Sequence, residues 1–149
     1  MRARLTVILV LALVGAAIAG YLTVLHYTTT VPLICVGQGG LINCADVLSS
    51  PQSVVLGLPV AAWGLAWFVL LALGAWVGRR DGRLMPWLTG WALAGAVVVV
   101  YLVYVEFDVL HAVCIWCSTL HLIILVITGL AVWPAAAGDA ADQHGSDVA

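Results

Sequence analysis

Residues 59–78 read PVAAWGLAWFVLLALGAWVG, an unbroken apolar run without a charged side chain. A helix of about 20 apolar residues is long enough to cross the hydrocarbon core of a bilayer. The run is continuous rather than alternating, which favours a helix over a membrane β-strand, and an open strand edge would leave backbone groups unpaired in lipid. The stretch therefore predicts a transmembrane helix.

Three more runs of this kind lie at about residues 5–27, 86–105 and 113–133. Of all 149 residues, 64% are hydrophobic and only 8% are charged, whereas about 25% are charged in an average soluble domain. An ordinary soluble protein is thereby excluded. We predict an all-α integral membrane protein, a four-transmembrane-helix bundle that forms one domain over residues 1–133, with an outer loop at 28–58.

The two ends of the chain need separate interpretation. Arg2 and Arg4 before the first run, and Ala17-Ile18-Ala19 within it, also fit a cleavable signal peptide. The apolar run continues through Leu25, beyond the roughly 15 residues of a signal-peptide core, so we expect it to be retained as a helix. After Trp133 the hydrophobic pattern ends, and residues 134–149 are predicted to be a disordered cytoplasmic tail.

The arginines predict the orientation. All five basic residues are arginines, at positions 2, 4, 79, 80 and 83, and four crossings put these positions on one side. The positive-inside rule makes that side the cytoplasm, with both termini. The loops at 28–58 and 106–112 then face an extracytoplasmic compartment such as a periplasm. Disulfides persist there, and all four cysteines, Cys35, Cys44, Cys114 and Cys117, fall on that side.

The motif Cys114-Ile-Trp-Cys117 places two thiols on one face of the first turn of the last helix. A reversible disulfide can close at this spacing. The N-terminus of a helix favours a thiolate, which is the nucleophile of thiol–disulfide exchange and can also attack an electrophilic quinone ring. The motif thus predicts a redox-active pair.

Other interpretations of the cysteines remain open. Covalent haem attachment requires a histidine after the second cysteine, where this chain has Ser118. One alternative is a metal site, such as zinc, ligated by the four thiols, although Cys35-x8-Cys44 is not a typical zinc spacing. A second alternative is a non-enzymatic membrane scaffold in which the disulfides only stabilise the outer loop. We expect no metal, and we keep both the scaffold and the Cys-ligated metal site as alternatives.

Several side chains near the motif are candidates for binding a quinone. His121 lies one turn after Cys117 inside an apolar run, where an ionisable residue is a functional candidate. It would donate a hydrogen bond to a quinone carbonyl or a proton to the reduced ring. The alternative is a structural histidine that bonds to a neighbouring helix. Tryptophans offer a flat apolar wall or act as interface anchors. These candidates are Trp63, Trp67 and Trp116, whereas Glu106, Asp108 and His111 are expected to be solvated in the short outer loop.

A combination of motifs resembles the vitamin K epoxide reductase (VKOR) family in its bacterial form. The motifs are Cys35, CADVLSSP at 44–51, GLPV at 57–60, WG at 63–64 and CIWC at 114–117, and the resemblance covers about residues 5–133. It implies a four-helix bundle around a quinone, with the outer loop folded as a cap that contains a short helix. A bacterial inner-membrane location follows from the same resemblance.

The resemblance also implies roles for single residues. Cys114 and Cys117 match the redox motif of the family, and Cys117 is the cysteine that meets the quinone, such as ubiquinone or menaquinone. Cys35 and Cys44 match the loop pair that accepts electrons from a thioredoxin-fold partner, after which Cys44 exchanges with Cys114. Ser50 matches a serine near the quinone site.

The resemblance adds further expectations about partners and substrate. Many bacterial relatives carry a fused thioredoxin-like domain, and this chain ends without one, so we expect a separate DsbA-like protein as electron donor. We expect membrane lipid and quinone as further partners, and no nucleic acid. The Gly57-Leu-Pro59 turn differs from the vertebrate enzymes, so vitamin K epoxide is not the expected substrate. Relatives often have tyrosine where this chain has His121. DsbB-type quinone reductases catalyse the same net reaction, but their CxxC lies in the first outer loop.

Overall fold

The structure, a computed structural model, describes residues 2–28, 34–35, 39–80 and 82–146. Within these residues, four long helices form the molecule: α1 (Arg2–Tyr27), α3 (Val60–Gly78), α4 (Met85–Tyr104) and α5 (Ile115–Ser146). Each includes or adjoins a segment long and apolar enough to cross a membrane, namely Ala3–Tyr27, Val60–Gly78, Gly82–Val109 and Ile115–Trp133. The prediction of an all-α four-helix membrane bundle is confirmed.

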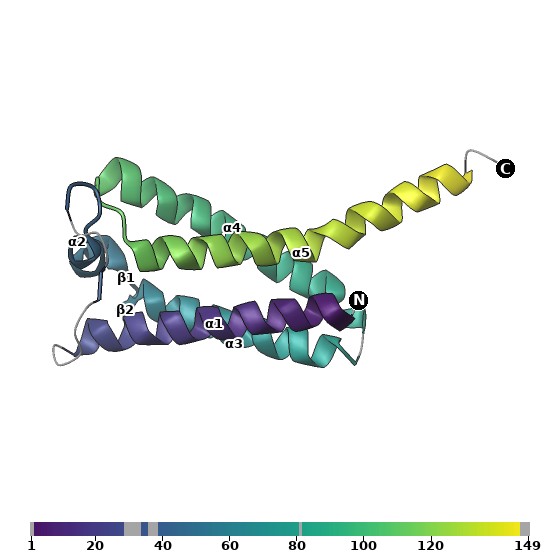
Figure 1. Ribbon diagram of the computed structural model, residues 1–149, viewed down its shortest axis with the longest axis horizontal. Helices are drawn as coiled ribbons and strands as arrows, with labels where there is room; N and C mark the ends of the chain where they lie inside the picture. The colour runs from purple at the N-terminus through teal and green to yellow at the C-terminus, as the bar shows by residue number, and fades with distance from the viewer. Residues whose placement is uncertain (1, 29–33, 36–38, 81, 147–149) are drawn as a thin grey trace.

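The helices pack as two pairs. Helix α1 lies along α3, α4 lies along α5, and α1 also contacts α5 (Figure 1). Small residues permit the close approach that lipid-embedded helices need. A Cβ atom on Gly15 would collide with the ring of Phe68, so the close approach of α1 and α3 requires a glycine at this point.

The segment between α1 and α3 folds as a cap at one end of the bundle. It contains α2 (Cys44–Ser49), a 3₁₀ turn (η1, Pro51–Ser53) and the antiparallel hairpin of β1 (Val54–Val55) and β2 (Leu58–Pro59). The two residues that join the strands, Leu56 and Gly57, have φ of 55° and 80°, the positive values that a type I′ turn requires. The short helix expected in the cap is α2. Segments 29–33 and 36–38 of the predicted outer loop lie outside the described residues.

Two helices extend beyond their predicted ends. Helix α4 continues into a π-helical turn, η3 (Val105–Val109), where the sequence predicted the start of a loop. Helix α5 continues through residues 134–146, part of the segment predicted to be a disordered tail. That segment contains five alanines, and alanine has the highest intrinsic helix propensity. Residues 147–149 of the predicted tail lie outside the described residues.

The two ends of the bundle differ in chemistry. The N-terminus of α1 and the link between α3 and α4 lie at one end, and the cap lies at the other (Figure 1). The first end therefore carries the arginines, at 2, 4, 79, 80 and 83. The cap end carries both cysteine pairs, because α5 begins there.

Candidate functional site

The four cysteines form one disulfide and one pair of thiols. Cys35 and Cys44 are joined by a disulfide with a Cα–Cα distance of 6.2 Å. Cys114 and Cys117 are free. Since Cys44 is the first residue of α2, the disulfide connects the loop that follows α1 to the cap helix.

A short backbone pairing joins the cap to the start of α5. Ile42 forms a parallel bridge with Val113. The N–H of Asn43 donates to the carbonyl of Val113 at 3.1 Å, and the N–H of Val113 donates to the carbonyl of Leu41 at 2.8 Å. The Asn43 side chain also accepts the backbone N–H of Asp46 at 3.2 Å and so caps α2. The residues just before Cys44 and the residue just before Cys114 are thus held together.

This pairing sets Cys44 against Cys114. Cys114 comes directly after Val113, and Cys44 comes directly after Asn43, whose N–H donates to the carbonyl of Val113. Both cysteines are completely buried, and they pack in one cluster with Val47 and Ala112. The cap disulfide and the first thiol of the CxxC motif therefore share one buried cluster.

Cys114 occupies the N-cap position of α5. Its Sγ accepts the backbone N–H of Cys117 at 3.4 Å. Hydrogen bonds from the Cys117 side chain, and from the backbone N–H groups of Cys117 and Trp116, lower the pKa of the Cys114 thiol from 9.0 to about 7, although burial opposes the shift. A thiol with this pKa is about half ionised near neutral pH, so Cys114 is suited to thiol–disulfide exchange.

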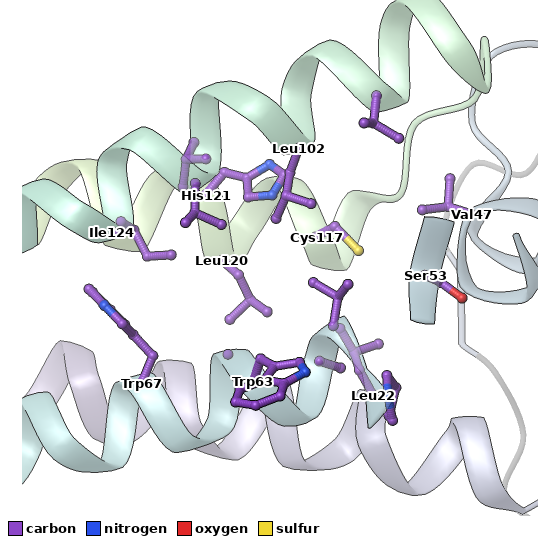
Figure 2. Close-up of a pocket in the computed structure, with 18 of the residues that line it drawn as sticks. Leu22, Val47, Ser53, Trp63, Trp67, Leu102, Cys117, Leu120, His121 and Ile124 are labelled. Atoms are coloured by element: carbon purple, nitrogen blue, oxygen red, sulfur yellow. The ribbon is translucent and has the colours of Figure 1, made fainter. Parts of the chain in front are cut away.

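Beyond Cys117 the helices and the cap line a partly open cavity of about 440 Å³, within the ~300–1,000 Å³ of typical ligand pockets (Figure 2). Its walls come from α1, the cap, α3, α4 and α5, and they are mainly apolar. Polar groups are few. They belong to His26, Ser50, Gln52, Ser53, Trp63, Trp67, Trp91, Glu106, Cys117 and His121.

The CxxC motif therefore lies between two environments. Cys117 lines the cavity, and Figure 2 shows its sulfur directed toward the space between α5 and α3. Cys114 is not among the residues that line the cavity and belongs to the cluster around Cys44. Two thiols one helical turn apart thus face a disulfide on one side and a ligand-sized cavity on the other.

Four of the predicted quinone-contact residues lie on the cavity wall, namely Ser50, Trp63, Trp67 and His121. Ser50 is 8% exposed, and its hydroxyl donates to the carbonyl of Val47 at 2.8 Å. His121 is 7% exposed and forms no hydrogen bond with any residue that the structure describes. The indole N–H of Trp63 donates to the carbonyl of Val55 at 3.1 Å, which fixes the ring near the N-terminal end of α3.

Trp116 lies elsewhere, although the sequence predicted it as part of the wall. Its indole N–H donates to the carbonyl of Ile34 at 2.6 Å, and its ring meets that of Tyr21 edge-on with centroids 5.8 Å apart. It is not among the cavity-lining residues. The reason is its place one residue before Cys117 on α5, from which the side chain turns toward α1. Trp116 joins the outer loop to the bundle.

The burial of Glu106 contradicts the prediction that this residue is solvated. It was expected to be solvated in a loop, but it is 5% exposed and lines the cavity. The buried positions of α4 are spaced by four, three and four residues, at Leu88, Ala92, Gly95 and Val99. Continued by three and four residues, this spacing arrives at Glu106. The sequence contains this spacing, but the predicted helix ended at residue 105, so Glu106 was assigned to the loop.

A search against models of known protein families gives one match over most of the chain. The model is described as the vitamin K epoxide reductase family, and it matches residues 6–132. This range includes the four apolar spans, apart from a few terminal residues, together with both cysteine pairs and the cavity wall. The chain belongs to the vitamin K epoxide reductase family.

Proposed function

We propose that the protein is a membrane thiol-to-quinone oxidoreductase that reoxidises a periplasmic thioredoxin-fold, DsbA-like partner. Membership of the family implies a membrane oxidoreductase that acts on disulfides and quinones. One observation carries the proposal further. The CxxC motif adjoins the cap disulfide through Cys114 and the cavity through Cys117.

The cavity fits a quinone by its chemistry. A quinone has a flat apolar ring with two carbonyl oxygens that accept hydrogen bonds, and it takes up two electrons and two protons when it is reduced. The wall is mainly apolar, and the His121 ring, which lacks another described partner, is available to donate to a carbonyl. Ser50 and Trp63 lie on the same wall. Ubiquinone and menaquinone both have a ring of this kind.

In the proposed thiol steps, electrons move from the cap to the cavity. The partner's dithiol reduces the Cys35–Cys44 disulfide. The Cys44 thiolate then attacks Cys114 of an oxidised CxxC pair, which forms a Cys44–Cys114 disulfide and releases Cys117. Cys35 attacks Cys44 and frees Cys114. The cap is then oxidised and the CxxC pair is reduced, which is the state of the cysteines in the structure.

The reduced CxxC pair completes the cycle. Cys114 and Cys117 form a disulfide, and their two electrons pass to the quinone bound beside Cys117. The net result is an oxidised partner and a quinol, so electrons and protons balance. The lowered pKa of Cys114 supports its part as both attacking and leaving thiolate, because such a thiol ionises near neutral pH.

We further propose that the protein lies in the bacterial inner membrane with its cap in the periplasm. The arginines gather at the opposite end of the bundle, which the positive-inside rule assigns to the cytoplasm. Both termini would then be cytoplasmic. The Cys35–Cys44 disulfide would face the compartment in which disulfides form.

The first test mixes the purified, dithiothreitol-reduced protein with decyl-ubiquinone under anaerobic conditions and follows the quinone absorbance. The wild type is expected to consume quinone, whereas Cys117→Ala is expected to lose the reaction to below detection, because the thiol next to the cavity is gone. Ser118→Ala, which changes the neighbouring residue outside the cavity wall, is the matched control and should react as the wild type does.

Two results would contradict the proposal. Normal turnover by Cys117→Ala would mean that electrons leave by another route. Absence of reaction in the wild type, with all four thiols shown to be reduced, would favour the non-enzymatic scaffold or the Cys-ligated metal site. Metal analysis of the purified protein separates those two alternatives.

A further inference from the structure

Glu106 is a buried carboxyl group without a partner. It is 5% exposed, and its side chain forms no hydrogen bond or ion pair with any residue that the structure describes. Polar groups that are buried in a protein are nearly always paired, and an isolated buried charge is very costly. An ionisable group at membrane depth is accordingly a functional candidate by default.

The backbone holds Glu106 beside the CxxC motif. It lies in the π-helical turn η3, and such turns often occur at functional sites. The N–H of Leu110 donates to the carbonyl of Val105 at 2.9 Å, and the N–H of Ala112 donates to the carbonyl of Glu106 at 3.1 Å. Ala112 packs in turn against Cys114. Glu106 is therefore fixed between the cluster of Cys114 and the cavity.

Glu106 has no arginine as a counter-ion on the described cavity wall. No arginine is among the residues that line the cavity. The other titratable groups on the wall are His26 on α1 and both Cys117 and His121 on α5, and Cys114 lies just outside it. No cation on the described cavity wall holds this carboxyl in its ionised form, which leaves it able to give up or take up a proton.

We propose that Glu106 is the proton-transfer residue of the thiol-to-quinone reaction. The inference rests on the proposed function, and it assigns a task that neither the family match nor the cysteines supply. Glu106 lines the same wall as Cys117, the thiol that loses a proton, and the same cavity as the oxygens that gain one.

The proton balance is simple. Oxidation of the Cys114–Cys117 dithiol breaks two S–H bonds, forms one S–S bond and releases two electrons and two protons. Reduction of the quinone takes up the same two electrons and two protons and forms two O–H bonds. The Glu106 carboxyl gives its proton to a quinone oxygen and regains one from the thiol pair. A second transfer in the same way supplies the other oxygen, and Glu106 returns to its starting state.

The test compares Glu106→Gln with Asp108→Asn, its matched control on the same turn. Asp108 is exposed and lies outside the cavity wall. General acid–base catalysis contributes roughly 10²- to 10⁴-fold to a rate. Glu106→Gln is therefore expected to slow reduction of decyl-ubiquinone about 100-fold, and Asp108→Asn should leave it unchanged. Thiol trapping should show that exchange between the cap disulfide and the CxxC pair keeps its wild-type rate in both variants.

A second readout separates proton transfer from a merely structural role. The wild type is expected to show a solvent deuterium isotope effect on quinone reduction, together with a limb in its pH–rate profile that Glu106→Gln lacks. Glu106→Asp retains a carboxyl and should retain both features at a lower rate. The other ionisable side chains on or beside the cavity wall are unchanged in all of these variants, so only the limb that disappears with the carboxyl belongs to Glu106.

Other results would contradict the proposed role of Glu106, and each points to a different explanation. Glu106→Gln at the wild-type rate removes Glu106 from the reaction. A slow Glu106→Gln with the wild-type pH profile and isotope effect makes the residue structural. If the glutamine variant does not fold, Glu106→Asp decides, and loss of both features there rejects proton transfer. A wild type that reduces no quinone refutes the proposed function itself, which is a different result from all of these.

Discussion

The two thiols of the CxxC motif differ because they end in different surroundings. Cys114 caps α5, accepts the backbone N–H of Cys117 and is completely buried next to Cys44. Cys117 is only partly buried and lines the cavity. One sequence motif thus supplies a thiol suited to exchange with the cap and a thiol suited to contact with a ligand.

Titration of Cys114 tests this difference. In a protein whose Cys35 and Cys44 are both replaced by serine, the Cys114 thiol is expected to ionise with a pKa of about 7, measured by thiolate absorbance at 240 nm. The thiolate then predominates above pH 7 and the thiol below it. Cys117→Ala removes the largest cause of the shift, the side-chain hydrogen bond, and should move the pKa of Cys114 upward toward 9.0.

A control variant shows whether the transition near pH 7 belongs to Cys114. Cys114→Ala in the same serine background should abolish the transition near pH 7, since Cys117 alone remains. A transition that persists in Cys114→Ala would assign the reactive thiol to Cys117 and reverse the roles of the pair.

For single residues, the sequence predicted contacts between side chains that are near each other along the chain. His121 follows Cys117 by four positions, so a helix alone places both on one face, and both line the cavity. Trp116 is different, because its indole bonds to Ile34, 82 positions earlier in the chain. No local spacing contains that contact. Glu106 was recoverable in principle, but only by extending the buried stripe of α4 past its predicted end.

At the scale of elements, the parallel pairing of Ile42 with Val113 decides whether the cysteine pairs meet. It joins the strand-like residues before α2 to those before α5. These segments are about 70 residues apart in sequence, and composition or periodicity does not reveal their register. Helix positions follow from hydrophobic runs, whereas a two-residue bridge in a loop leaves no such pattern.

Val113→Pro tests the importance of that pairing. Proline lacks the N–H that donates to the carbonyl of Leu41, and it should loosen the segment that positions Cys114. Loss of one hydrogen bond costs about 0.5–1.5 kcal/mol, so thiol exchange between Cys44 and Cys114 is expected to slow by up to about tenfold. Trapping of the Cys44–Cys114 disulfide over time measures this rate.

Val113→Ala keeps the N–H and is the matched control for Val113→Pro. It should exchange at nearly the wild-type rate, because only side-chain atoms are removed. Reduction of quinone by a protein whose CxxC pair has first been reduced with dithiothreitol should survive in both variants. Equal loss of this last activity would show that proline had disturbed the cavity rather than the contact between the cysteine pairs.

In the molecule as a whole, the disulfide, the thiols and the cavity lie one after another along one axis. The cap disulfide, the buried cluster of Cys44 and Cys114, and the cavity beside Cys117 follow one another from the cap end inward. The arginines gather at the far end. Hydrophobic runs and arginine positions were enough to predict the four spans, because lipid imposes the helical solution on any such run.

The same asymmetry predicts how the molecule lies in its membrane, and single cysteines test it without altering any arginine. In a cysteine-free background, Leu56→Cys places a thiol at the 87% exposed tip of the β1–β2 hairpin, and Gly82→Cys places one at an exposed site between α3 and α4. A membrane-impermeant maleimide added to intact spheroplasts is expected to label Leu56→Cys at once and Gly82→Cys only after the membrane is permeabilised. The opposite pattern would put the Cys35–Cys44 disulfide in the cytoplasm, where thiols are kept reduced, and a periplasmic partner would then be impossible. Labelling therefore bears on the direction of electron flow as much as on topology, since the donor must meet the cap from the side on which the cap lies.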